Sequence, residues 1–292
     1  MKKILVPVDF SEHTDMVCRY AIEIAKKTGG EIRLFHAYFD YFIASNSSSF
    51  PYSVDTGEVF NQEMILEIRN ETKAEMEKLA GKLIEQLIKD SISNVIVVHT
   101  LTGGMPEDEI LNISDTYAPD LIVMGTRGKG GKELLTGKIS SKVVKNAKCR
   151  ILTIPRNATY RPVENLMYAT DFNDEDTHDL DKLFGLLKTY NPVIHCVHVN
   201  VDGDQLADAA KMPALKEHFS EKMASGRLVF KVIDNQNFVE AINQYVTDHK
   251  IDIISVVHHR KGFLKRLVSK SHTQELLVHS DVPLYIFPGE GN

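Results

Sequence analysis

Residues 3–10 read KILVPVDF, a short apolar run that ends on a carboxylate, and residues 165–172 read NLMYATDF. Both stretches close on the same pair, at Asp9-Phe10 and at Asp171-Phe172. Short apolar runs bounded by polar residues are typical of the buried strands of a parallel sheet. The pair recurs after 162 residues (171 − 9), which indicates that the chain contains one structural unit twice.

Two further anchors support the repeat. The offset of 162 also carries His36 onto His198. Further along, Asp120-Leu121-Ile122 matches Asp252-Ile253-Ile254 at an offset of 132, so the first half carries 30 extra residues (162 − 132) between its second and fourth strands.

Strand patterns alternate with helix patterns in both halves. In the first half the expected strands are Lys3–Val8, Glu31–Ala37, Asn94–Leu101, Asp120–Met124 and Arg150–Ile154. In the second half they are Asn165–Ala169, Val193–Val199, Leu228–Ile233, Ile253–Val257 and Pro283–Phe287. Helix patterns in the first half cover Glu12–Thr28, Glu63–Lys89, Glu107–Tyr117 and Lys138–Asn146. The alternation predicts an α/β fold of two tandem doubly wound, Rossmann-like domains, each with a five-stranded parallel sheet flanked by helices.

The expected domains are residues 1–156 and 163–292, joined by a short polar segment. The extra residues of the first half form an inserted loop at about 39–60, where a serine-rich run and a cluster of aromatic residues break the periodic pattern. Two interpretations of this loop stay open, a surface loop with a few packed rings and a lid over a nearby ligand crevice.

Composition limits the classes of function. The 292 residues carry a formal net charge of -6, which argues against broad binding to nucleic acid or to an anionic membrane. No apolar run is long enough for a membrane span, and the first residues lead directly into a strand pattern, so a cytoplasmic protein is expected. The three cysteines lack the spacing of a zinc ribbon or of a disulfide framework.

Ligands of open α/β sheets bind outside the carboxyl ends of the strands. Asp9 follows the first strand, where its carboxylate can accept hydrogen bonds from ribose hydroxyls or from an adenine amino group. A glycine-rich stretch, Gly125–Gly131, follows the fourth strand, and Gly137–Ser141 begins the next helix pattern. Glycine backbone and a helix N-terminus together form an anion cradle. The alternative is that these glycines only make a turn and a helix start.

Three segments resemble the universal stress protein family: Val6–Ser11, Leu34–Ala37 and Met124–Gly128. The nucleotide-binding branch of that family carries G-x2-G-x9-G-[ST] after its fourth strand. The resemblance covers the chain as two copies and implies that ATP, with or without Mg²⁺, binds in the first domain only. It implies a site made of Pro7, Val8, Asp9, Ala37, Met124, Gly125, Arg127, Gly128, Gly137, Lys138, Ile139 and Ser140.

The first half departs from that motif in two ways. Eight residues, not nine, separate Gly128 from Gly137, and Lys138 stands where the motif has serine or threonine. A shorter loop can move amides away from a phosphate, whereas a lysine can replace a hydroxyl contact by direct charge pairing.

The second half lacks both glycines of the tight turn, because Val257 and Arg260 stand opposite Gly125 and Gly128. No nucleotide is therefore expected there. A zinc site made from its histidines is disfavoured, because His195 and His198 lie three apart on one strand and point to opposite faces.

Three functions compete. The leading one is a stress-response protein that binds ATP or another adenine nucleotide as a structural or regulatory ligand. The second is an interaction module with the same fold and no nucleotide. An enzyme has the least support, because no catalytic set accompanies Asp9, and at most slow ATP hydrolysis is expected. The resemblance also implies that the two last strands pair within the chain, as in a dimer, and it allows two chains to associate.

Overall fold

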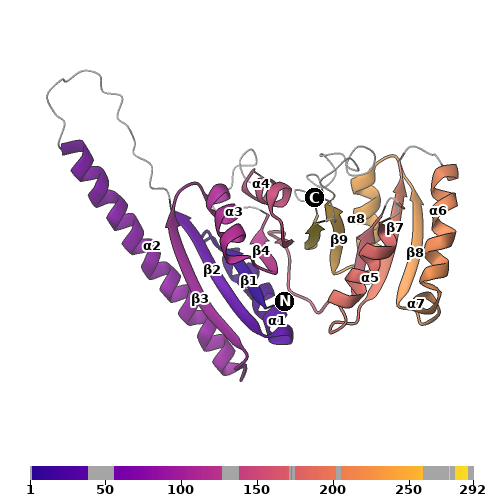
Figure 1. Ribbon diagram of the computed structural model, residues 1–292, viewed down its shortest axis with the longest axis horizontal. Coiled ribbons are helices and arrows are strands. Elements are labelled where there is room, and N and C mark those ends of the chain that lie inside the picture. Colours follow the sequence, from indigo (N-terminus) through magenta and orange to yellow (C-terminus); the bar gives the residue numbers. More distant parts are fainter. Residues whose placement is uncertain are drawn as a thin grey trace, which may run out of the picture. The chain divides into compact units, whose positions relative to one another are not determined.

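The computed structural model describes residues 2–38, 56–126, 138–170, 172, 175–201, 205–258, 276 and 280–288. Contacts divide the chain into two compact units, Met1–Ile122 and Val123–Asn292. Figure 1 shows the course of the chain and the labels of its helices and strands.

The first unit is built on parallel strands in the order β3-β2-β1-β4. The strands are β1 (Lys3–Pro7), β2 (Gly30–Tyr38), β3 (Val95–Gly103) and β4 (Leu121–Gly125), the last of which continues into the second unit. They are connected by helices α1 (Thr14–Thr28), α2 (Thr56–Lys89) and α3 (Pro106–Tyr117). β1 pairs with β4 through Ile4–Leu121 and Leu5–Ile122, so both strands run in the same direction.

Among the described side chains of α2, those that pack on the sheet lie in its C-terminal part. Its buried positions follow a helical spacing and are Thr72, Met76, Ala80, Leu83 and Leu87. None of the residues from Glu63 to Glu71 is buried, and this part of the helix extends beyond β2 and β3 in Figure 1. The apolar stripe of an amphipathic helix thus fixes α2 on the sheet over about half of its length.

The second unit contains strands in the order β5-β10-β9-β6-β7-β8. Its strands are β5 (Arg150–Ile154), β6 (Asn165–Ala169), β7 (Val193–Asn200), β8 (Leu228–Asp234), β9 (Ile253–His258) and β10 (Leu284–Pro288). Its helices are α4 (Lys138–Asn146), α5 (Asp176–Leu186), α6 (Gln205–His218), α7 (Ser220–Ala224) and α8 (Phe238–Asp248).

The last strand of the first half pairs with the last strand of the second half. β5 and β10 are antiparallel, with Leu152 opposite Tyr285, whereas the pairs β10–β9, β9–β6, β6–β7 and β7–β8 are parallel. Because β5 pairs with β10, it belongs to the second unit. The boundary between the two units therefore lies before β5 and not at the polar segment after it.

Helices α5 and α8 cover opposite faces of the second-half sheet. His195 on β7 contacts Tyr245 of α8. The next residue, Cys196, lies opposite Tyr168 in the register, and Tyr168 contacts Asp176 of α5. Because neighbouring residues of a strand point to opposite faces, the two helices lie on different sides.

The two halves share irregular backbone as well as regular elements. Left-handed residues occur at equivalent positions, with φ of 55° at Phe10 and 56° at Phe172, and of 48° at Ala118 and 51° at Lys250. Asp120 Oδ2 accepts hydrogen bonds from the amides of Lys2 and Lys3, and Asp252 Oδ2 accepts them from Glu164 and Asn165. The sequence repeat is therefore a structural repeat.

The predicted α/β class is confirmed, and Arg150–Ile154, Asn165–Ala169 and Lys138–Asn146 have the expected bounds. Most other bounds differ by one or two residues; α1, for example, begins at Thr14 and not at Glu12. The largest difference is at α2, which begins at Thr56 and not at Glu63, so the end of the inserted segment is helical. Its residues 39–55 lie outside the described residues. Among the residues that the structure describes, no helix is both long and apolar enough to cross a membrane.

Candidate functional site

The chain after β1 turns around the carboxylate of Asp9. Its Oδ1 accepts hydrogen bonds from the Ser11 amide at 3.1 Å, from the Ser11 hydroxyl at 2.7 Å and from the Thr14 hydroxyl at 3.2 Å. Thr14 is the first residue of α1, so the carboxylate also lies at a helix N-terminus, where negative charge is favourable. Asp9 is partly exposed and held in one orientation.

A histidine from the neighbouring strand supports this turn. His36 Nδ1 lies 2.7 Å from the carbonyl oxygen of Val8, and the His36 ring lies 4.7 Å from the ring of Phe10. The amide of Val8 donates to the carbonyl oxygen of Phe35 at 2.8 Å, which extends the β1–β2 pairing by one bond.

The remaining predicted residues of the first unit lie at the same strand ends. Pro7 is the last residue of β1, opposite Phe35 of β2, and Val8 follows it in a buried position. Ala37 is buried at 7% exposure near the end of β2. Pro7, Val8, Asp9 and Ala37 therefore come together at one edge of the sheet.

The other predicted residues belong to the second unit. Met124 and Gly125 end β4, and the next amide, Thr126, donates to the carbonyl oxygen of Ile154 at 3.0 Å. The Ser140 hydroxyl donates to the carbonyl oxygen of Thr126 at 3.2 Å, and Ser140 is buried. The first turn of α4 is thus fixed to the end of β4.

Part of the predicted loop cannot be placed. Arg127, Gly128 and Gly137 lie outside the described residues, and only the backbone of Lys138 is described, as the first residue of α4. Ile139, which follows it, is 37% exposed.

The equivalent strand end of the second half is built differently. Tyr168 and Thr170 donate their hydroxyl protons to the carboxylate of Asp176, and all three side chains are buried. The corresponding first-half residues, at the offsets given above, are Val6, Val8 and Thr14. Burial, followed by the charge of Asp176, raises the pKa of Tyr168 well above its usual value. A buried polar network thus occupies positions that are apolar or neutral in the first half.

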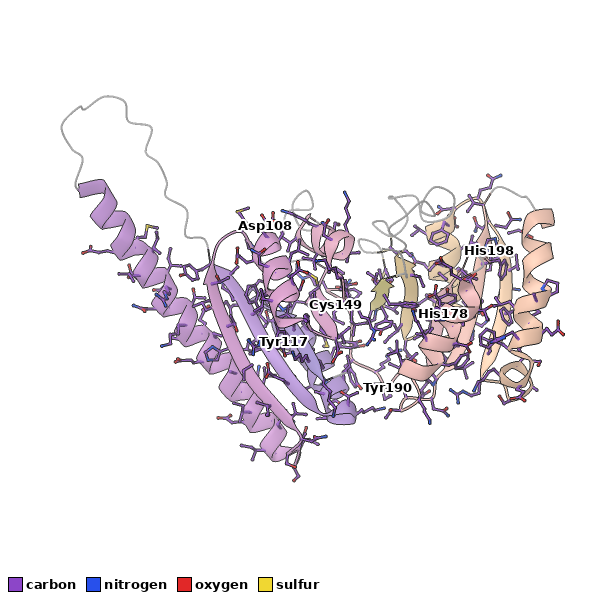
Figure 2. The ribbon with its side chains drawn as sticks, in the orientation of Figure 1. Asp108, Tyr117, Cys149, His178, Tyr190 and His198 are labelled. Carbon is purple, nitrogen blue, oxygen red and sulfur yellow. The ribbon has the colours of Figure 1, made fainter. Side chains whose placement is uncertain are left out.

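The histidines of β7 contact different partners. His195 Nδ1 lies 2.9 Å from the Tyr245 hydroxyl, whereas His198 Nδ1 lies 2.9 Å from the carbonyl oxygen of Thr170. Figure 2 labels His198 on β7. In the described part of the chain, no three histidine, cysteine or acidic side chains gather as metal ligands.

Sequence reasoning missed the partners of Asp9. The pattern Asp9-x-Ser11-x-x-Thr14 directly after a strand was a usable signal, because hydroxyl residues at such spacings commonly bond a preceding carboxylate at a helix start. The Tyr168, Thr170 and Asp176 network gave no comparable signal, because its members come together only when α5 packs on the sheet.

These features agree with the comparison to known sequences. The profile of the universal stress protein family matches residues 1–155 and 162–288, which together are nearly all of the chain. The chain belongs to the universal stress protein family. The two matches correspond to the two halves of the structural repeat.

Individual family members match one half or the whole chain. Universal stress protein MJ0531 of Methanocaldococcus jannaschii is 32% identical over 157 residues, which are 53% of this chain and 82% of that protein. Universal stress protein Slr1230 of Synechocystis is 23% identical across 98% of this chain and 100% of its own length. A solved universal stress protein structure from Archaeoglobus fulgidus covers 98% of this chain and 97% of its own, with a TM-score of 0.67 and 19% identity, so the tandem fold is shared.

Proposed function

We propose that this universal stress protein binds one adenine nucleotide per chain, with ATP as the primary ligand, and uses it as a structural or regulatory ligand in stress response. The site lies in the first half. Its residues are Pro7, Val8, Asp9, Ala37, Met124, Gly125, Arg127, Gly128, Gly137, Lys138, Ile139 and Ser140.

The observation that carries the proposal is the orientation of Asp9. Ser11 and Thr14 hold its carboxylate at the carboxyl end of β1, the place where open α/β sheets bind ligands. In this position the carboxylate would accept hydrogen bonds from ribose hydroxyls or from the adenine amino group. Ala37 on β2 carries a small side chain at the strand end where the adenine base would lie.

The phosphates are assigned to the loop after β4. β1 and β4 pair in parallel through Ile4–Leu121 and Leu5–Ile122. The bond from Ser140 to Thr126 brings the start of α4 next to the end of β4, and free amides at a helix start bind anions. Lys138 would add charge, and Mg²⁺ would accompany the triphosphate.

The second half is proposed to bind no nucleotide, because Val257 and Arg260 replace the turn glycines. No residue is assigned a catalytic role. A held triphosphate would at most undergo slow hydrolysis by an oriented water.

The alternative function is a scaffold or interaction module that binds no nucleotide. The observation that favours it is the shortened loop, with eight residues between Gly128 and Gly137 and Lys138 in place of a hydroxyl residue. Under this alternative, the hydrogen bonds of Asp9 only hold the turn before α1, and no ligand binds there.

Calorimetric titration of nucleotide-stripped protein with ATP and Mg²⁺ separates the two functions. One site per chain, with adenine nucleotide released from unstripped protein on denaturation and detected by mass spectrometry, supports the proposal. The variant Gly128→Arg would place a side chain where a phosphate must approach and should abolish binding. No binding and no released nucleotide would leave the scaffold function.

The proposal includes a cytoplasmic location and domains at residues 1–156 and 163–292, with the β5–β10 pair joining them. The simplest assembly is a single chain whose halves pair as in a dimer, and a further association of two chains stays open. Sedimentation velocity of the full chain distinguishes the two, since the first gives the mass of one chain and the second the mass of two.

A further inference from the structure

Two histidine contacts recur at the turn after the first strand of each half. His36 Nδ1 lies 2.7 Å from the carbonyl oxygen of Val8, and His198 Nδ1 lies 2.9 Å from that of Thr170. Because a carbonyl oxygen only accepts, Nδ1 carries the proton in both rings. The residue after the aspartate is Phe10 or Phe172, and each phenylalanine ring lies against the histidine, at 4.7 and 4.8 Å.

Each turn contains the same unfavourable backbone conformation. Phe10 has a φ of 55° and Phe172 a φ of 56°, in the left-handed region that bulky residues avoid. Such residues persist only where their surroundings fix them. The histidine provides that fixation twice over, by a hydrogen bond to the residue two before the phenylalanine and by ring contact with the phenylalanine itself.

The left-handed residue decides where Asp9 points. The chain reverses at Phe10, and this reversal brings the Ser11 amide and hydroxyl to Oδ1 of Asp9. Without it, the chain would continue away from the carboxylate. His36 contacts Val8 and Phe10, the two residues on either side of Asp9 in the sequence.

We propose that His36 is a positioning residue for the nucleotide site: its Nδ1–H bond to Val8 and its contact with Phe10 hold the Asp9 carboxylate in the orientation that receives the ligand. The part concerning nucleotide rests on the proposed function. The orientation of Asp9 does not, because it is measurable without a ligand.

The test compares three variants of the full chain. His36→Leu removes the donor, His36→Asn keeps a donor near the place of Nδ1, and His198→Leu removes the same two contacts in the half assigned no nucleotide. ATP affinity is measured by calorimetry, the Asp9 orientation by hydrogen exchange of the Ser11 amide, and stability by urea unfolding. His36→Leu should weaken ATP binding by about tenfold, as loss of an outer-shell partner commonly does, and should speed exchange at Ser11.

His36→Asn should keep most of the ATP affinity and most of the protection of the Ser11 amide from exchange. His198→Leu should cost similar stability and leave ATP affinity and Ser11 exchange unchanged, which separates positioning from general destabilisation. Where His36→Leu does not fold, His36→Gln replaces it, because the longer amide reaches the place of Nε2 and not that of Nδ1.

Unchanged Ser11 exchange in His36→Leu overturns the inference, and so does an equal loss of ATP affinity in His198→Leu. If the parent protein binds no ATP, the proposed function fails by itself. Ser11 exchange then decides alone, since faster exchange in His36→Leu still supports the positioning of Asp9 and unchanged exchange still contradicts it.

Discussion

Tyr168 donates its hydroxyl proton to the Asp176 carboxylate across 2.7 Å, inside the second half of the chain. Thr170 donates to the other carboxylate oxygen, and Asp176 is 1% exposed. Asp176 begins α5, so the positive end of the helix dipole adds to the two hydrogen bonds. The first half has Val6, Val8 and Thr14 at the equivalent positions and forms no such network.

Asp176→Ala should destabilise the protein by about 2–4 kcal/mol, because it leaves two buried hydroxyl groups without their acceptor. Asp181→Asn on the same helix is the matched control, since Asp181 pairs with His218 at the surface, and exposed pairs contribute about 0–1 kcal/mol. Urea unfolding followed by circular dichroism measures both. Equal effects of the two variants would mean that the network adds little to stability.

His195, which lies against Tyr245 and His249, should make the stability of the protein depend on pH. His195 is buried, its Nδ1 contacts the Tyr245 hydroxyl, and the His249 ring lies 5.7 Å away. Burial, and then the nearby His249, lower the pKa of His195 from 6.5. The unfolded chain therefore takes up a proton near pH 6.5 that the folded chain does not, so the free energy of unfolding should fall as the pH falls below about 6.5, by at most about 1.4 kcal/mol per pH unit.

Urea unfolding between pH 5 and pH 8 measures this dependence. Because the chain has twelve histidines, the difference between the parent protein and His195→Gln isolates the contribution of His195. The variant should have a flatter profile in acid, and parallel profiles would contradict the prediction.

Gly30 should not tolerate a side chain. Its φ is 113°, and a Cβ would lie 2.2 Å from the carbonyl oxygen of Lys2, where β1 and β2 begin to pair. Gly30→Ala should cost about 1–3 kcal/mol from the backbone conformation alone, with more from the clash. Gly81→Ala in α2 is the control: a Cβ there meets nothing within 4 Å, and alanine favours a helix by up to about 1 kcal/mol. The midpoint temperature of thermal unfolding should fall in Gly30→Ala and rise in Gly81→Ala.

Nucleotide should stabilise the protein through the first half. ATP at a hundred times its dissociation constant should raise the free energy of unfolding by about 2.7 kcal/mol. Gly128→Arg should abolish this increase, whereas Arg260→Glu, at the equivalent position of the second half, should retain it. Differential scanning calorimetry with and without ATP measures this stabilisation as a rise in the unfolding temperature. Loss of that rise in Arg260→Glu would place a ligand in the second half.

The strands were predictable because burial on both faces leaves near-continuous apolar runs such as that of β4. The start of α2 at Thr56 was not, because Gly57 in its first turn disfavours a helix. Asp9 was recognised from its place after a strand, but its bonds to Ser11 and Thr14 depend on the left-handed backbone of Phe10, which sequence patterns do not reveal.

The sequence by itself determined the repeat, the α/β class and the place of Asp9 at a strand end, because these follow from the order and spacing of residue types along one chain. Only the tertiary structure decided which half keeps an apolar strand end and which fills it with Tyr168, Thr170 and Asp176. It also brought His36 against the carbonyl oxygen of Val8 and His198 against that of Thr170, at equivalent places in the two halves. Such contacts join residues that are distant in the chain, and they form only when helices and strands have packed together.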